Sequence, residues 1–88
     1  MEKTGSIKKV LGNRIRALRR EMDLSQEAFA DKCGIDRTYM SGIERGVRNP
    51  TLVVICAISD GLGMDLSHLF GCRDDHGGYR YILLGFNP

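Results

Sequence analysis

The sequence has no run of apolar residues that approaches the roughly 18 needed to cross a membrane, although 42% of its 88 residues are hydrophobic. Residues 1–12 also lack the apolar segment of a secretory signal. Its three cysteines are an odd number without regular spacing, which is typical of reduced thiols rather than of a disulfide framework. These absences predict a protein of the cytoplasm, and a length of 88 residues predicts a single domain.

Signatures of catalysis and of metal binding are also missing. The sequence contains no nucleophile elbow, P-loop or paired-carboxylate spacing. His68, Cys72 and His76 are spaced by four, but Gly71 and Gly77 would break a helix through them, and no CxxC or HExxH pattern accompanies them. We therefore expect no enzyme, no metal site and no cofactor.

Charge is unevenly distributed, although the formal net charge is only +2. Residues 1–24 hold seven Lys or Arg against three acids, residues 25–50 hold four of each, and residues 51–88 hold two against four. The basic N-terminal part is the part expected to face a polyanion. A solvated helix surface would carry the same charge, so this distribution favours a nucleic-acid partner without identifying one.

Apolar periodicity and capping residues predict five helices between residues 7 and 70. The first helix has an apolar stripe with steps of four, three and four, formed by Leu11, Ile15, Leu18 and Met22. The helices are expected at residues 7–22, 26–33, 36–45, 52–61 and 65–70.

The fourth of these helices is the most apolar. Residues 52–58, LVVICAI, form a nearly unbroken hydrophobic run, which predicts burial on most sides and hence the core helix of the domain. Gly61 and Gly63 are expected to end it.

Residues 25–46, SQEAFADKCGIDRTYMSGIERG, meet the requirements of a helix-turn-helix motif. Gly34 supplies the turn, because glycine adopts the left-handed conformation without steric cost. With Met40 placed inward and about 100° between successive residues, Ile43 and Glu44 also face inward. The outward face is then small and polar, and consists of Thr38, Ser41, Gly42 and Arg45.

The sequence strongly resembles the phage repressor and Cro family, also called the Xre family, over about residues 11–70. The most specific stretches are LSQEAFA, the turn at Gly34, DRTYMSGIERG and RNPTL. In that family the second helix of the motif enters the major groove and dimers occupy two half-sites. The resemblance implies an all-α, five-helix lambda-repressor-like DNA-binding domain at residues 1–71, with residues 72–88 as an extension outside the common domain.

The resemblance also implies roles for individual side chains. Contacts to base edges are expected from Arg37, Thr38, Tyr39 and Ser41, of which Tyr39 suits base or phosphate equally. Phosphate contacts are expected from Gln26, Arg45, Arg48 and Asn49.

Three further positions have chemical interpretations. The planar guanidinium of Arg37 matches guanine O6 and N7. The inward carboxylate of Glu44 needs a partner, and the family pattern supplies Arg19 as a structural ion pair. Gly42 stands where family members often present a reading side chain, so it is either a tolerated helix glycine or a point of closer backbone approach to DNA.

The C-terminal extension predicts a strand. Residues 79–84, YRYILL, are rich in strand-forming types, and a lone strand in a helical domain has unpaired edges that can template another strand. We expect it to pair with its counterpart in a second chain across a two-fold axis. The alternatives are a frayed chain end, with the fourth and fifth helices forming the contact, and a docking segment for another protein.

The sequence therefore predicts sequence-specific binding of double-stranded operator DNA by a homodimeric transcriptional regulator, a repressor of bacterial or phage origin. The alternative is an antitoxin whose main partner is a toxin protein bound through the extension, with DNA binding for autoregulation. A controller of a restriction-modification operon is a further class of small Xre-type regulator.

Overall fold

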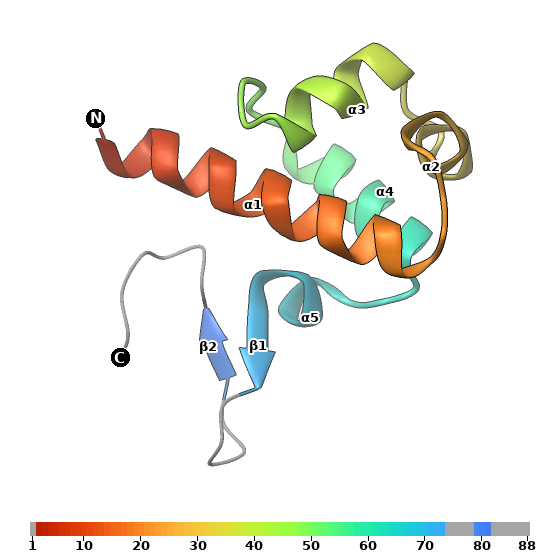
Figure 1. Ribbon diagram of the computed structural model, residues 1–88. Helices are drawn as coiled ribbons and strands as arrows, with labels where there is room; N and C mark the ends of the chain where they lie inside the picture. Colours follow the sequence, from red (N-terminus) through yellow and green to blue (C-terminus); the bar gives the residue numbers. More distant parts are fainter. Residues whose placement is uncertain (1, 74–78, 82–88) are drawn as a thin grey trace.

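The computed structural model describes residues 2–73 and 79–81 of the chain. Five helices and two short strands follow one another, so the predicted five-helix fold is confirmed (Figure 1). Their bounds are α1 (Glu2–Glu21), α2 (Gln26–Cys33), α3 (Arg37–Glu44), α4 (Leu52–Leu62), α5 (Leu66–Phe70), β1 (Gly71–Arg73) and β2 (Tyr79–Tyr81).

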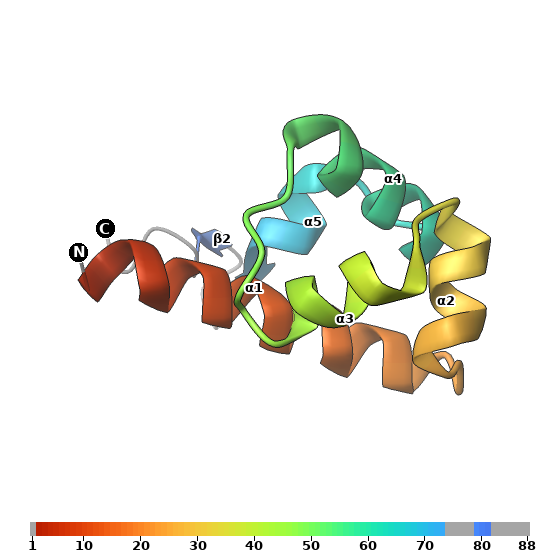
Figure 2. The same ribbon diagram turned by 90° about the horizontal axis from the view of Figure 1, so that it is seen from above.

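The helices surround one apolar core. α1 packs against α3 and α5, while α2 packs against α3 and α4, and the N-terminal part of α1 extends beyond the other helices (Figures 1 and 2). All five helices contribute buried apolar side chains to the core, which are Leu11, Ile15, Phe29, Ala30, Met40, Ile43, Ile58 and Leu69. No helix among the described residues combines the length and the hydropathy that a membrane span requires.

Short polar side chains define where the helices begin. Ser25, Asp36, Thr51 and Asp65 each accept a hydrogen bond from a backbone N–H in the first turn of the helix that follows. The bond from the backbone of His68 is the main reason that the pKa of Asp65 lies below its ordinary value. Asp36 in this way places the start of α3 only two residues after Gly34, which ends α2.

Two helix bounds differ from the prediction in an informative way, whereas the others agree to within one residue. α1 begins at Glu2 rather than at residue 7. The apolar stripe did not reveal this earlier start, because the first turn of the helix is polar and adds nothing to the stripe. α4 does not end at Gly61 but continues to Leu62, and Gly63 caps it with a φ of 71°. Gly61 is instead buried within the helix, where an added Cβ would overlap Cys33 Sγ on α2.

The predicted burial of α4 on most sides is wrong. Ile58 is fully buried, but Leu52 and Val53 expose 66% and 78% of their surface, and Cys56 is exposed as well. An apolar run shows that burial is favourable, but it does not show that the covering surface belongs to the same chain. The N-terminal half of α4 is thus an uncovered apolar surface of the described residues.

The prediction that the C-terminal strand lacks a partner within its own chain is also wrong. β2 pairs with β1 in an antiparallel hairpin, with Gly71 opposite Tyr81. Gly71 was expected only to stop a helix, and residues 72–73 only to begin the extension, because three residues are too few to show a strand pattern. Residues 82–84 of the predicted strand lie outside the described residues.

Arg14 of α1 forms hydrogen bonds with the start of this hairpin. Its Nη2 donates to the carbonyl oxygens of His68, at 2.8 Å, and Gly71, at 3.1 Å, while its Nε donates to that of Leu69 at 3.1 Å. These carbonyls belong to the end of α5 and the first residue of β1, so a single side chain joins both elements to α1.

Candidate nucleic-acid interface

α2 and α3 form a helix-turn-helix whose second helix is amphipathic. Gly34 ends α2 with a φ of 71°, and Asp36 caps α3 two residues later. Met40, Ile43 and Glu44 face inward as predicted, and each is 1% exposed or less. Outward lie the exposed Arg37, Thr38 and Arg45, with Ser41 half-buried beside them. The structure thus presents a polar face of α3 above an apolar support.

α1 crosses the end of α3 with almost no space between the two backbones. A Cβ added at Gly12 would lie 2.5 Å from the carbonyl oxygens of both Ile43 and Glu44. At Gly46, just beyond α3, an added Cβ would lie 2.9 Å from Lys9 Cα. Sequence reasoning missed this crossing. Its signal was a glycine inside a helical pattern, which costs about 1 kcal/mol against alanine and therefore calls for a packing reason.

Glu44 is the centre of a buried polar network that joins α1, α2 and α3. Arg19 donates to it through Nε (2.7 Å to Oε2) and Nη2 (3.0 Å to Oε1), and Gln26 Nε2 donates to Oε1 at 3.0 Å. Arg16 lies 3.6 Å from Oε1, and its Nη2 donates to the Glu44 carbonyl at 3.4 Å. The Glu44 side chain is 0% exposed and that of Arg19 is 9% exposed.

This network keeps Arg19 charged in spite of its burial. The hydrogen bond with Glu44 is the largest cause that raises the pKa of Arg19, and it outweighs the opposing effect of desolvation. The remaining Nη1 donates to the Leu24 carbonyl at 2.8 Å. A bidentate pair of this kind fixes orientation as well as distance, so α3 is held on α1 in one rotational setting.

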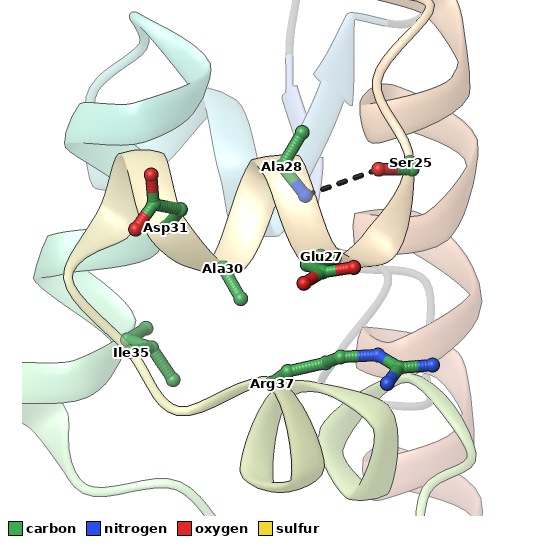
Figure 3. Close-up of a pocket in the computed structure, with 7 residues that line it drawn as sticks. All are labelled: Ser25, Glu27, Ala28, Ala30, Asp31, Ile35 and Arg37. Atoms are coloured by element: carbon green, nitrogen blue, oxygen red, sulfur yellow. Dashed lines mark hydrogen bonds between the residues drawn. The ribbon is translucent and has the colours of Figure 1, made fainter.

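Four of the predicted DNA-contacting residues meet at the N-terminal end of the motif. Gln26 at the start of α2 lines a shallow hollow together with Arg37, Thr38 and Ser41 of α3. Figure 3 shows a larger adjoining hollow between α2 and α3, along which the Arg37 side chain lies with its guanidinium below Glu27. Arg37 is exposed, so its guanidinium is accessible at the edge of both hollows.

The other four predicted residues lie apart from this hollow. Tyr39 is half-buried on another side of α3, with the guanidinium carbon of Arg48 5.9 Å from the centre of its ring. Arg45, Arg48 and Asn49 are exposed at the end of α3 and in the loop before α4. The structure therefore divides the predicted site into one group at the starts of α2 and α3 and a second group at the end of α3 and in the loop that follows, with Arg48 of the loop reaching back to Tyr39.

The prediction that Gly42 faces outward is wrong. The loop after α3 folds back, with the N–H groups of Val47 and Arg48 donating to the Gly42 carbonyl at 3.0 and 3.2 Å. Gly42 is consequently buried beneath Arg48. A helical wheel of α3 alone does not contain the loop, so it could not reveal this contact.

Metal ligands do not gather in the described part of the chain. No group of three or more His, Cys, Asp or Glu residues there is arranged to hold an ion. His76, one of the three residues with regular spacing, lies outside the described residues.

The fold and the candidate site are those of a helix-turn-helix protein, with a polar second helix that is rigidly supported from behind. Residues 15–69 match the protein family described as helix-turn-helix, and the chain belongs to that family.

Individual proteins share most of this region. The chain is 54% identical over 65 residues to the control protein C.MunI of a Mycoplasma species. The matched region covers 73% of this chain and 88% of that protein. The crystal structure of the restriction-modification controller protein C.AhdI from Aeromonas hydrophila matches with a TM-score of 0.70 and 41% identity, over 72% of this chain and 96% of that one.

A second similar structure contains DNA. It is the tetramer of the restriction-modification controller protein C.Esp1396I in complex with its natural 35 base-pair operator. Its TM-score is 0.68 with 36% identity, and the match covers 73% of this chain and 84% of that chain.

Proposed function

We propose that this protein is a dimeric transcriptional regulator that binds double-stranded operator DNA with α3 in the major groove. The observation that carries the proposal is the hollow where Gln26, Arg37, Thr38 and Ser41 meet, on a helix fixed from behind by the Glu44 network. The major groove, about 12 Å wide, admits one α-helix. A regulator of this kind acts on DNA in the cytoplasm.

Within this class we favour a controller of a restriction-modification operon. The support is similarity to C.MunI, C.AhdI and C.Esp1396I, each of which matches over more than 80% of its own length. The antitoxin alternative has no comparable support from these three relatives.

The group at the starts of α2 and α3 and the group beyond the end of α3 suit different contacts. Arg37, Thr38 and Ser41 project from the N-terminal end of the helix, where side chains of such motifs contact base edges. Gln26 Nε2 carries two hydrogens and gives one to Glu44, so the other remains for a phosphate. Arg45, Arg48 and Asn49 supply further donors to the backbone of the DNA.

Replacing Arg37 with alanine tests the base contact. We expect the variant to fold normally but to lose about 5- to 150-fold of its preference for operator over scrambled DNA, because a bidentate arginine–guanine pair contributes about 1–3 kcal/mol of discrimination. The operator is first selected from a random pool with the wild-type protein, and both duplexes are then titrated at one salt concentration.

Arg45→Ala is the matched control for this experiment. As a phosphate contact it should weaken binding to operator and scrambled DNA alike and reduce the salt slope by about one. If Arg37→Ala behaves in this same way, Arg37 does not read a base. If the wild-type protein selects no sequence at all, the proposed function itself is wrong.

The exposed surface of α4 is the contact that we propose between the two copies. Leu52 and Cys56 are one turn apart and therefore share a side of the helix, and Val53 between them exposes 78% of its surface. β2, which pairs on one edge with β1 among the described residues, remains as a second contact, in accordance with the predicted role of residues 72–88. A two-fold dimer would present two α3 helices to half-sites about one helical turn apart.

Val53→Asp should therefore convert the dimer to a monomer, since it places an unpaired charge in an apolar contact. Light scattering across a dilution series measures the change. Asn13→Asp introduces the same charge at an exposed position of α1 and should leave the dimer intact. A Val53→Asp protein that stays dimeric, combined with a monomeric chain truncated after Gly71, would assign the contact to the extension instead.

A further inference from the structure

The loop that follows α3 returns across the helix it has just left. Two backbone hydrogen bonds to the Gly42 carbonyl close this turn, and Gly46 at its corner has a φ of 76°. The side chain of Arg48 consequently passes over the middle of α3, although residue 48 lies beyond the end of the helix.

Gly42 provides the space through which that side chain passes. A Cβ added at Gly42 would overlap Arg48 Cγ and approach Nε to 3.3 Å and Cδ to 3.4 Å. The overlap is with the stem of one side chain, whereas at Gly12 it is with backbone. A Cβ at position 42 would therefore displace Arg48, and its three nearest neighbours would all be atoms of that one side chain.

The far end of Arg48 reaches the ring of Tyr39. Its guanidinium carbon lies 5.9 Å from the ring centre, which is within the range of a cation–π interaction. A cation–π interaction depends on the charge of the guanidinium and does not use up its N–H groups as hydrogen-bond donors. Arg48 is exposed overall, so a phosphate could reach those donors while the stem stays in place.

We propose that Gly42 is a positioning residue for DNA binding: by lacking a side chain, it holds the Arg48 guanidinium against Tyr39 in the orientation that binds a phosphate beside α3. The proposal rests on the proposed function for its DNA partner. It replaces both earlier interpretations of Gly42, because the glycine neither is neutral nor brings the helix backbone closer to the DNA. Because the Arg48 side chain is already held in place in the free protein, binding of a phosphate costs less conformational entropy than it would for a freely rotating side chain.

Gly42→Ala separates this role from a structural one. Alanine favours the helix over glycine, and Arg48 can swing into solvent, so we expect a melting temperature equal to or above that of the wild type. Affinity for the selected operator should nevertheless fall about tenfold, the loss expected for one charged phosphate contact, and the salt slope should decrease by about one.

A double-mutant cycle shows whether Gly42 acts through Arg48. Arg48→Ala should reproduce the loss of affinity, and Gly42→Ala combined with Arg48→Ala should bind no more weakly than Arg48→Ala alone. If Gly42→Ala weakens binding equally with and without Arg48, the glycine acts directly at the DNA and the proposal is overturned. Unchanged affinity of Gly42→Ala would overturn it as well.

The free protein offers a measurement that needs no DNA. Side-chain protons of Arg48 above the Tyr39 ring should show an upfield shift in the NMR spectrum, which Gly42→Ala and Tyr39→Leu should both abolish. If the shift is present in the wild type but no duplex binds, the proposed function fails while the Gly42 contact stands. If Gly42→Ala leaves the shift unchanged, the positioning role fails whatever the DNA result.

Discussion

Replacing Glu44 with alanine is expected to lower the free energy of unfolding by about 3–5 kcal/mol, the typical cost of removing one partner from a buried ion pair. The variant leaves Arg19 charged in a site where its side chain is only 9% exposed. It also removes the acceptor of the Gln26 amide. For a protein whose total stability is about 5–15 kcal/mol, this loss approaches the unfolding threshold.

Urea unfolding monitored by circular dichroism measures this effect. Glu27→Ala is the matched control, because Glu27 is an exposed carboxylate in the first turn of α2, and its removal should cost less than about 1 kcal/mol. Arg19→Ala should be as damaging as Glu44→Ala, and the double variant should lose less than the sum of the two. A Glu44→Ala protein as stable as Glu27→Ala would contradict the buried network.

The position of Glu44 explains why the network has two arginines. A carboxylate in the last turn of α3 lies at the negative end of the helix dipole, where it is unfavourable. Arg19 compensates the charge directly, and Arg16 adds a second cation at 3.6 Å. The same contacts hold the C-terminal end of α3 against α1. Stability and the presentation of the candidate DNA-binding face therefore depend on the same side chains.

The starts of α2 to α5 and the inward face of α3 were predictable because their causes are local. Ser25 and Asp36 cap α2 and α3 through bonds to residues three positions ahead, and an interaction that short in sequence is visible as a pattern. The inward setting of Met40 and Ile43 follows from helical periodicity alone.

The features that were not predictable depend on distant parts of the chain. The burial of Gly42 depends on a loop that returns over α3, and the exposure of Val53 depends on what covers α4. The phosphate role predicted for Gln26 did not include its bond to Glu44, which lies 18 residues away in sequence. A pattern in one segment shows which kind of contact a residue needs. Which distant residue provides that contact is determined by the tertiary fold.

Gly12→Ala should be severely destabilising although alanine is the better helix former. The gain in helix propensity is about 1 kcal/mol. Against it stands a methyl group placed 2.5 Å from two carbonyl oxygens, those of Ile43 and Glu44, and 2.9 Å from the Glu44 carbonyl carbon. Because these atoms belong to backbone, no side-chain rotation relieves the overlap, and α1 and α3 must separate.

Separation of the two helices would also lengthen the contacts that cross between them. The Arg16 bond to the Glu44 carbonyl, already 3.4 Å long, would break first, and the bidentate Arg19 pair would lose its geometry. Overpacking of a core costs about 1–3 kcal/mol and occasionally more, so we expect a net loss at the upper end of that range. The affinity for operator should fall as well, since α3 is displaced from its support.

Thermal unfolding and operator titration of three variants test this expectation. Asn13→Ala changes the adjacent exposed residue of α1 and should leave both stability and binding near the wild-type values. Gly42→Ala also adds a methyl group to a buried helix glycine, but its overlap is with a movable side chain, so it should reduce binding while keeping stability. Gly12→Ala should reduce both. A Gly12→Ala protein that melts at or above the wild-type temperature would mean that α1 and α3 do not meet backbone to backbone at this point.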